Sequence, residues 1–273
     1  RAPAMASDPL AFMSTTQGTA AVMLSSTALC FALQKAALPL WRAVLPNDGE
    51  RMRAAGKPEA ATQVPANFVA VTHAVVAFIL SFVGLVRPAP SLLDADGGID
   101  VYGFSTRSQF TMALSCGYFL WDLIVSVAEG WGAAFTAHAI ACLFVYANAL
   151  PGFLHYHGLF FLLFEASTPF LHTRWYLIAT GRGSGALFSV VQYSFAAAFF
   201  VVRILVGWPV SFFWWGAMLD LLASGTAHAP PVVVGYLACN LVLNGLNGYW
   251  FYAIISSALG SGKGKPKGSA AAA

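Results

Sequence analysis

Four ionisable side chains lie inside long apolar stretches of the chain: Asp122, His138, Glu165 and Arg203. A charge is costly in the hydrocarbon core of a membrane, so residues of this kind mark a functional site by default. His138 could act as a general base or as a transient nucleophile, with Asp122 or Glu165 orienting its ring. Arg203 could neutralise a thioester oxygen or a phosphate. An ion pair between Glu165 and Arg203 is the structural alternative for these two residues.

Other polar residues repeat along the apolar stretches at the spacing of one α-helical face. Because lipid cannot solvate such stripes, we expect them to face one another across a polar-lined interior. The alternative is that they only hold neighbouring helices together by hydrogen bonds. The stripes are Thr111, Ser115, Tyr118, Asp122, Ser126 and Glu129; His138, Cys142 and Tyr146; His157, Glu165, Thr168 and His172; Ser189, Gln192 and Arg203; and Tyr236, Asn240, Asn244 and Asn247.

The composition defines the class of protein that positions these stripes. The chain has 273 residues, of which 58% are hydrophobic and only 9% are charged, whereas about 25% are charged in an average soluble protein. These values exclude an ordinary soluble domain and a disordered chain. A net charge of +3, without a basic stripe ahead of the C-terminal tail, excludes a nucleic-acid partner. We therefore predict an all-α polytopic membrane protein.

About seven transmembrane helices are predicted, arranged as a ring around the polar-lined interior. Residues 208–224 are apolar but short, and form either an eighth span or a continuation of the sixth past a kink at Pro209. Seven spans gather most Lys and Arg on one side, as the positive-inside rule requires, whereas eight divide them almost evenly. The C-terminus and the 42–57 loop then share the cytosol-like side. The predicted spans are 18–40, 66–86, 108–128, 131–150, 153–172, 185–206 and 232–259.

The regions flanking the spans indicate a location. Residues 1–17 form an N-terminal segment whose start resembles the remnant of a transit peptide, rich in Arg and Ala. Residues 18–65 hold the first span and its loop, 66–259 form the main helical domain, and 260–273 form a flexible Gly, Lys and Ala tail. We predict an internal membrane, of the endoplasmic reticulum or of an organelle such as a plastid or mitochondrion. His155 and His157 are expected at a membrane interface.

A series of short motifs runs in order through about residues 66–258. They are Thr72-His73-Ala74, Gly117-Tyr118-Phe119-Leu120-Trp121-Asp122-Leu123, His138, Glu165-Ala166-Ser167-Thr168-Pro169-Phe170, Thr173-Arg174-Trp175, Phe200-Val201-Val202-Arg203-Ile204, Pro209 and residues 244–251. The ordered set resembles the TLC domain family, which contains the ceramide synthases and several smaller lipid-linked membrane proteins. The smaller proteins are the nearer match.

The chain departs from the ceramide synthases at the positions that would carry catalysis. Those enzymes have a His-His pair where this chain has Ala137 and His138. They also have a His-Asp pair, followed by a second Asp, where this chain has Phe164-Glu165 and then Thr168. The resemblance thus implies a lipid-related role, and these departures disfavour a catalytic function.

Three functions follow as hypotheses. The first is lipid handling, meaning lipid binding, sensing or membrane-lipid homeostasis, in which the ring encloses an acyl chain or head group. The second is a structural accessory subunit of a larger organellar membrane complex, such as a photosynthetic or respiratory assembly. The third is an acyl-CoA-dependent lipid acyltransferase with His138 as the candidate catalytic residue.

The expected ligand is a bound lipid, and the expected partners are membrane lipids or other membrane subunits. No metal site or other cofactor is predicted, because His138, Asp122 and Glu165 lack a recognised ligand spacing. The four cysteines, which are far apart in apolar sequence, are expected to be free thiols. The predicted lipid pocket comprises His73, Tyr118, Asp122, His138, Glu165, Arg203, Asn240 and Asn244.

Overall fold

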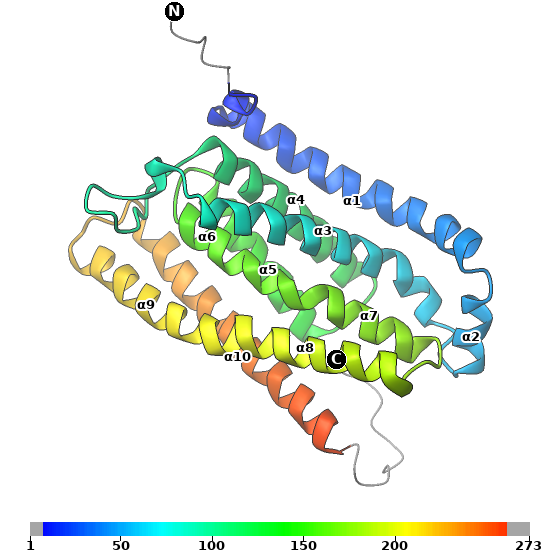
Figure 1. The fold of residues 1–273 in the computed structure, drawn as a ribbon. Coiled ribbons are helices and arrows are strands. Elements are labelled where there is room, and N and C mark those ends of the chain that lie inside the picture. Colours follow the sequence, from blue (N-terminus) through cyan, green and yellow to red (C-terminus); the bar gives the residue numbers. More distant parts are fainter. Residues whose placement is uncertain (1–7, 261–273) are drawn as a thin grey trace, which may run out of the picture.

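The computed structural model describes residues 8–260, with side chains described to residue 257. The predicted all-α class is confirmed over this range (Figure 1). The predicted transit remnant and the predicted flexible tail lie almost wholly outside it. The elements are η1 Ala11–Ser14, α1 Thr16–Val44, α2 Asp48–Ala54, α3 Ala60–Val86, η2 Pro90–Leu92, α4 Thr106–Ala128, α5 Ala133–Ala149, α6 His155–Leu162, η3 Leu163–Ser167, α7 Thr168–Ala179, α8 Gly185–Phe199, η4 Phe200–Val206, α9 Gly207–Ala223 and α10 Pro230–Gly260.

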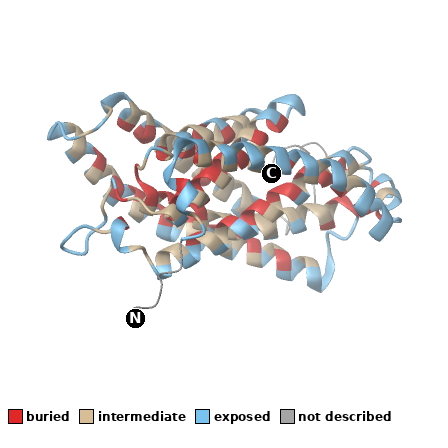
Figure 2. Cartoon of the chain, turned by 90° about the horizontal axis from the view of Figure 1, so that it is seen from above, coloured by how far each residue is buried: buried red, intermediate tan, exposed pale blue. Residues whose placement is uncertain are grey.

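Five of the described helices are long and apolar enough to cross a membrane: α1, α3, α4, the continuous α8–η4–α9 and α10. Many of their large apolar side chains point outward, among them Leu24, Ile79, Phe212 and Tyr252. Figure 2 shows the exposed residues on the outer surfaces of the helices and the buried ones between them. An apolar exterior on this scale suits lipid as the solvent. The protein is a multi-pass integral membrane protein.

The helix contacts form a closed circuit. Helix α1 packs against α4, α4 against α5, α5 against α10, and α10 against α9. The circuit returns through α8, which packs against α7, and through α7 and α6, which pack against α3. Helix α3 packs in turn against α1. Residues far apart in sequence therefore face a common interior.

Helix α1 approaches α4 closely because Gly117 has no side chain. A Cβ atom at Gly117 would clash with the backbone carbonyl oxygen of Met23. Two small hydroxyl residues of α1 use this proximity, since Ser26 donates to the carbonyl of Leu114 at 2.7 Å and Thr27 to that of Gly117 at 2.8 Å. Small residues are the usual means of close helix packing in membranes.

The segment 208–224 continues the sixth predicted helix, which settles the alternative left open by the sequence. Residues Gly185–Ala223 form one continuous helix of 39 residues, about 58 Å long at the α-helical rise. Its irregular part is the π-helix η4, which ends two residues before Trp208 and three before Pro209. Pro209 has no N–H to donate to the carbonyl four residues earlier, so regular α-helical bonding cannot be maintained there.

The fifth predicted span, 153–172 with its last turn broken at Pro169, is interrupted earlier and runs further than predicted. The chain instead forms α6, the 3-10 segment η3 and α7, and continues to Ala179. Pro169 lies in the first turn of α7 and cannot donate the bond that would join the two helices. The prediction failed because the apolar pattern is continuous across a break in the backbone hydrogen bonding.

One end of the helix circuit, called here the Asp48 end, is closed by a network around Asp48 of α2. The Asp48 carboxylate accepts hydrogen bonds from Arg51 at 3.0 Å, from Arg182 at 2.6 Å and from the hydroxyl of Tyr176. The indole N–H of Trp41 donates to the same Tyr176 hydroxyl. Burial acts to raise the pKa of Asp48, but the bonds from Tyr176 and Arg182 and the positive charges outweigh it and hold the pKa below its ordinary value.

The opposite end, called here the Tyr102 end, joins two loops. The Tyr102 hydroxyl donates to the carbonyl of Thr226 at 3.1 Å and accepts from the backbone N–H of His228 at 3.0 Å. Arg182 therefore lies at the Asp48 end and Thr226 at the Tyr102 end. The continuous α8–η4–α9 helix connects the two ends.

Candidate functional site

Two irregular helical segments, η3 and η4, pack against each other inside the circuit. In η3 the 3-10 winding and the nearby proline disturb the regular backbone bonding. Arg203 belongs to η4 and supplies the missing donors. Its Nη2 donates to the carbonyl of Phe164 at 3.2 Å, and its Nε donates to the Ser167 hydroxyl at 3.3 Å. Irregular backbone at membrane depth is tolerated where a neighbour restores its hydrogen bonds.

Arg203 also reaches α10 and two aromatic faces. Its Nη1 donates to Oδ1 of Asn247 at 3.1 Å. The guanidinium lies 5.2 Å from the ring centroid of Phe199 and 5.7 Å from that of Phe164, which are cation–π distances. Arg203 is 8% exposed. The three hydrogen bonds use three of the five guanidinium N–H groups, so two N–H groups remain.

The ion pair considered between Glu165 and Arg203 is not formed. In the described part of the chain, the salt bridges are those of Asp48 with Arg51 and with Arg182. Arg203 binds neutral oxygens instead, because its fork is occupied by the irregular η3 backbone and by Asn247. The buried positive charge is therefore without a carboxylate at ion-pair distance.

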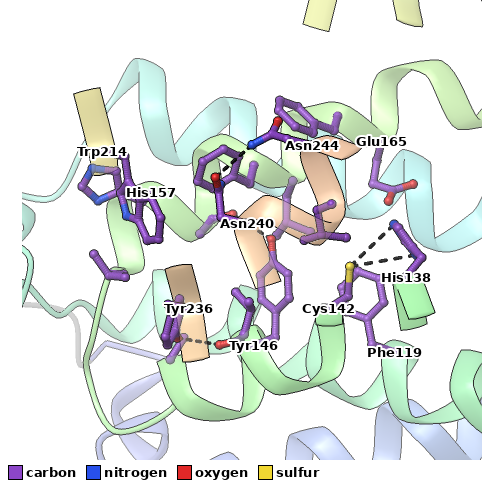
Figure 3. A pocket seen from close by; sticks show the side chains of 18 of the residues that line it. Phe119, His138, Cys142, Tyr146, His157, Glu165, Trp214, Tyr236, Asn240 and Asn244 are labelled. Atoms are coloured by element: carbon purple, nitrogen blue, oxygen red, sulfur yellow. Dashed lines mark hydrogen bonds between the residues drawn. The ribbon is translucent and has the colours of Figure 1, made fainter. Parts of the chain in front are cut away.

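A cavity of about 880 Å³, a volume that includes some open solvent, lies beside Arg203. Side chains from α4, α5, α6, η3, η4, α9 and α10 line it, and most of the lining is apolar. Figure 3 shows His138 and Glu165 at one end of the cavity and His157 and Trp214 at the other. The cavity thus has an apolar body with polar groups at both ends.

Five of the eight residues predicted for the pocket come together around this cavity. They are His138, Glu165, Arg203, Asn240 and Asn244. Two of the predicted stripes face it completely, since Cys142 and Tyr146 of α5, and Tyr236 and Asn247 of α10, also belong to its lining. These stripes point inward because α5 and α10 are neighbours in the circuit.

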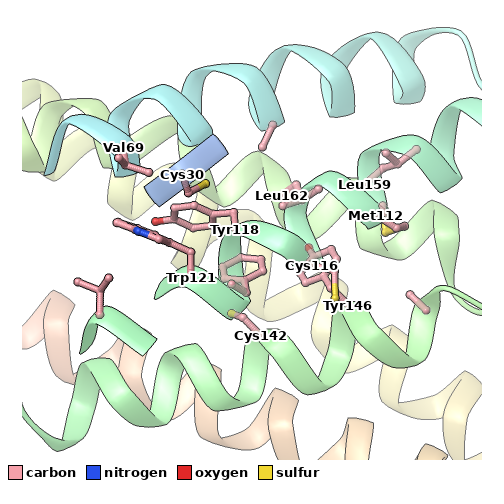
Figure 4. Packing of buried hydrophobic residues seen from close by; sticks show 14 of the residues in the cluster. Cys30, Val69, Met112, Cys116, Tyr118, Trp121, Cys142, Tyr146, Leu159 and Leu162 are labelled. Carbon is pink, nitrogen blue, oxygen red and sulfur yellow. The ribbon is translucent and has the colours of Figure 1, made fainter. Parts of the chain in front are cut away.

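The other three predicted residues, His73, Tyr118 and Asp122, do not line this cavity. His73 stacks on Tyr118 with 3.7 Å between ring centroids, and its Nε2 lies 3.4 Å from the Ser115 hydroxyl. Tyr118 belongs to the apolar cluster shown in Figure 4. Asp122 is half-buried on α4. The polar stripe of α4 faces α1 and α3, while Phe119 of α4 faces the cavity.

Two histidines expected at a membrane interface face the protein rather than its exterior. His155 is fully buried, with Nδ1 2.8 Å from the Ser108 hydroxyl and Nε2 3.0 Å from the carbonyl of Ala149. His157 lines the cavity. The sequence could indicate that His157 faces the interior, because His157 lies on the same predicted polar stripe as Glu165. Trp214 lacks such a signal, because it lies in uninterrupted apolar sequence.

His138 makes one polar contact that bears on catalysis, with the Cys142 thiol at 3.6 Å from Nε2. Among the described residues no carboxylate accepts a hydrogen bond from its ring. The orienting role suggested for Asp122 or Glu165 is therefore not realised in this geometry. Within residues 8–260, no group of three His, Cys, Asp or Glu side chains is arranged to hold a metal ion.

Comparison with known proteins gives a consistent family. The family profile described as the TLC domain matches residues 63–256. An uncharacterised TLC domain-containing protein of Schizosaccharomyces pombe is 33% identical over 58% of this chain and 54% of its own length. TLC domain-containing protein 4-B of Danio rerio is 30% identical over 64% of this chain and 67% of its own length.

A third relative is named for a different property. Topoisomerase I damage affected protein 4 of Saccharomyces cerevisiae is 34% identical over 54% of this chain and 54% of its own length. The chain thus spans about half the length of the two yeast relatives. No solved structure matches the chain.

Proposed function

The chain belongs to the TLC domain family, and we propose that it binds a single lipid in the cavity beside Arg203. In this proposal the chain crosses the membrane seven times, through α1, α3, α4, α5, α6–α7, α8–α9 and α10. The helix circuit then surrounds the cavity within an internal membrane. The family is associated with lipid-related roles, which supports the choice of ligand by analogy.

The observation that carries the proposal is the incomplete pairing of Arg203. Removing a charged group from water is unfavourable unless hydrogen bonds and an opposite charge compensate for the lost hydration. Arg203 lines the cavity, has two N–H groups beyond its three hydrogen bonds, and lacks a carboxylate at ion-pair distance. A carboxylate or phosphate oxygen of a lipid supplies both the charge and the acceptors.

The rest of the cavity suits the apolar part of the same lipid. Small-molecule sites are usually lined by apolar side chains with a few polar groups, and this cavity has that composition. Phe161, Leu162 and Leu243 contribute to an apolar lining that would hold an acyl chain. The amide groups of Asn240 and Asn244 are bound mainly to each other and to the Ser211 hydroxyl. Arg203 is therefore the group that would bind an acidic head group.

Native mass spectrometry of the protein, purified in a mild detergent, tests the proposal. We expect the wild-type protein to carry one co-purified lipid, and the Arg203→Gln variant to lose it. The Arg203→Lys variant, which keeps the charge without the fork, should retain part of the occupancy. The matched control is Arg107→Gln, because Arg107 is exposed at the start of α4.

Two results would contradict lipid binding at Arg203. One is equal lipid occupancy in the wild-type protein and the folded Arg203→Gln variant. The other is a wild-type protein without lipid that purifies only as part of a larger particle of fixed stoichiometry, which would favour a structural subunit. Thermal unfolding of each variant in detergent identifies a loss of folding.

A further inference from the structure

The end of the cavity remote from His138 holds two polar atoms without a partner. The indole N–H of Trp214 and Nδ1 of His157 are both buried and make no hydrogen bond. Trp214 is only 4% exposed, and both residues line the cavity. An unpaired buried polar atom is unfavourable, so two of them in one place indicate a group that is absent from the protein itself.

The contrast with the next residue shows that this chain provides a partner even for a half-buried indole. Trp215 follows Trp214 on α9, and its Nε1 donates to Oδ1 of Asn240 at 2.9 Å. The Asn240 and Asn244 amides are joined to each other and to Ser211, and the contacts of this cluster do not extend to Trp214 or His157. The two unpaired atoms therefore form a separate polar position.

This position is far from Arg203 along the cavity. Arg203 and Trp214 lie on one continuous helix, eleven residues apart in sequence, so about three helical turns separate them. Figure 3 shows Trp214 and His157 together at one end, away from Glu165 and His138. A lipid whose charged group contacts Arg203 therefore reaches this second position with its other end.

The local structure around Trp214 is closely packed. Leu154, the residue before α6, has the left-handed φ of 59°, which is strained for a leucine. Its N–H donates to the carbonyl of Val101 at 2.7 Å, and its side chain packs in the same buried cluster as Trp214, Phe153 and Tyr236. The backbone bond and the packing fix the start of α6, which carries His157.

The chemistry of the two atoms limits the group that can bind both. An indole N–H can only donate, so it requires an oxygen acceptor. Nδ1 of a neutral histidine accepts when the ring proton is on Nε2. A hydroxyl group satisfies both, because its oxygen accepts from Trp214 and its hydrogen donates to His157.

We propose that the ligand is a hydroxylated acyl lipid whose hydroxyl group binds between Trp214 and His157 while its acidic group binds Arg203. This inference rests on the proposed function and names the class of lipid. The length of lipid between these two groups is set by the stretch of helix between Arg203 and Trp214, which are eleven residues apart in sequence.

Competition between paired fatty acids tests the inference. Delipidated wild-type protein is mixed with lauric, myristic or palmitic acid and with the terminally hydroxylated acid of the same length. Binding is measured by native mass spectrometry. We expect the hydroxylated acid of the best-fitting length to be preferred by at least about tenfold, because a site built for a hydroxyl rejects the analogue that lacks it.

Variants of the second position identify its role. Trp214→Phe should abolish the preference for the hydroxylated acid while binding of the plain acid persists. His157→Phe should reduce the same preference. This variant provides the test if Trp214→Phe does not fold. The control is Trp208→Phe on the same helix, since Trp208 is 46% exposed and does not line the cavity.

The outcomes separate the two proposals. Equal binding of plain and hydroxylated acids to wild-type protein overturns the hydroxyl position but leaves lipid binding intact. A preference that survives in both folded variants also overturns it. If the wild-type protein binds none of the acids, and carries no co-purified lipid, both proposals fail together.

Discussion

Two buried charges illustrate how differently single residues can be paired in this protein. Asp48 receives hydrogen bonds from Arg51, Tyr176 and Arg182, so its carboxylate is fully used by the protein. Arg203 binds three neutral oxygens and keeps two N–H groups beside a cavity. The first arrangement is complete in itself and is structural. The second is incomplete and is the better candidate for binding a ligand.

Removing the charge of Asp48 should destabilise the protein. We expect Asp48→Asn to lower the free energy of unfolding by about 2 kcal/mol, because hydrogen bonds to a buried charged group are lost. Glu50→Gln on the same helix, at an exposed position, should have little effect. Thermal or denaturant unfolding in detergent measures both variants.

The same network predicts a pH dependence. The folded-state pKa of Asp48 lies below its ordinary value of 3.8. Its contribution to stability is therefore fully present above about pH 4 and is lost as the pH falls through the folded-state pKa. The stability difference between wild type and Asp48→Asn should shrink below that pH. A difference that stays constant down to acid unfolding would contradict this assignment.

Among the helices, irregularity and close approach have separate roles. The two irregular segments η3 and η4 meet at Arg203, which gives the site its shape. By contrast, α1 and α4 pack through Gly117 at a distance that admits no side chain. Residues of the α4 stripe contact neighbouring helices, since Glu129 accepts from the Gln34 amide of α1 at 3.3 Å and the Ser115 hydroxyl lies 3.4 Å from Nε2 of His73 in α3. Contacts of this kind hold membrane helices together.

The α1–α4 contact can be tested with one methyl group. Gly117→Ala should lower the free energy of unfolding by about 1–3 kcal/mol, because the new Cβ meets the rigid backbone of Met23. Gly216→Ala is the matched control. A Cβ at Gly216 meets nothing within 4 Å, so this variant should be neutral or stabilised by up to about 1 kcal/mol. Equal stability of the two variants would contradict the close contact between Gly117 and the backbone of Met23.

At the scale of the whole molecule, the basic residues are unevenly distributed between the two ends. The Asp48 end carries Arg42, Arg51, Arg53, Lys57 and Arg182. The Tyr102 end carries Arg87 and Arg107 in the loop between α3 and α4 and at the start of α4. The positive-inside rule then orients the Asp48 end toward the cytosol-like side.

Epitope accessibility measures this orientation. A short epitope inserted after Gly56 should be accessible from the cytosol-like side of sealed membranes, and one inserted after Gly97 only from the opposite side. If both epitopes are accessible from the same side, α3 does not cross the membrane between the two loops and the orientation is contradicted. Permeabilised membranes, in which both epitopes react, provide the control.

The sequence by itself determined the all-α membrane class, the family and the inward-facing stripes of α5 and α10. Apolar length and helical periodicity are local properties, so the stripes of α5 and α10 could be predicted to face a common interior. The same reasoning placed His138, Glu165 and Arg203 in one site. Composition likewise sufficed to identify the exterior as lipid-facing.

Only the tertiary structure decided which faces meet and where the helices are irregular. It turned the stripe of α4 toward α1 and α3, broke the fifth span at η3, and kept Gly185–Ala223 continuous. It also placed Trp214 and His157 together at the far end of the cavity. These features depend on contacts between residues distant in sequence, and the hydropathy of a single segment carries no information about its neighbours.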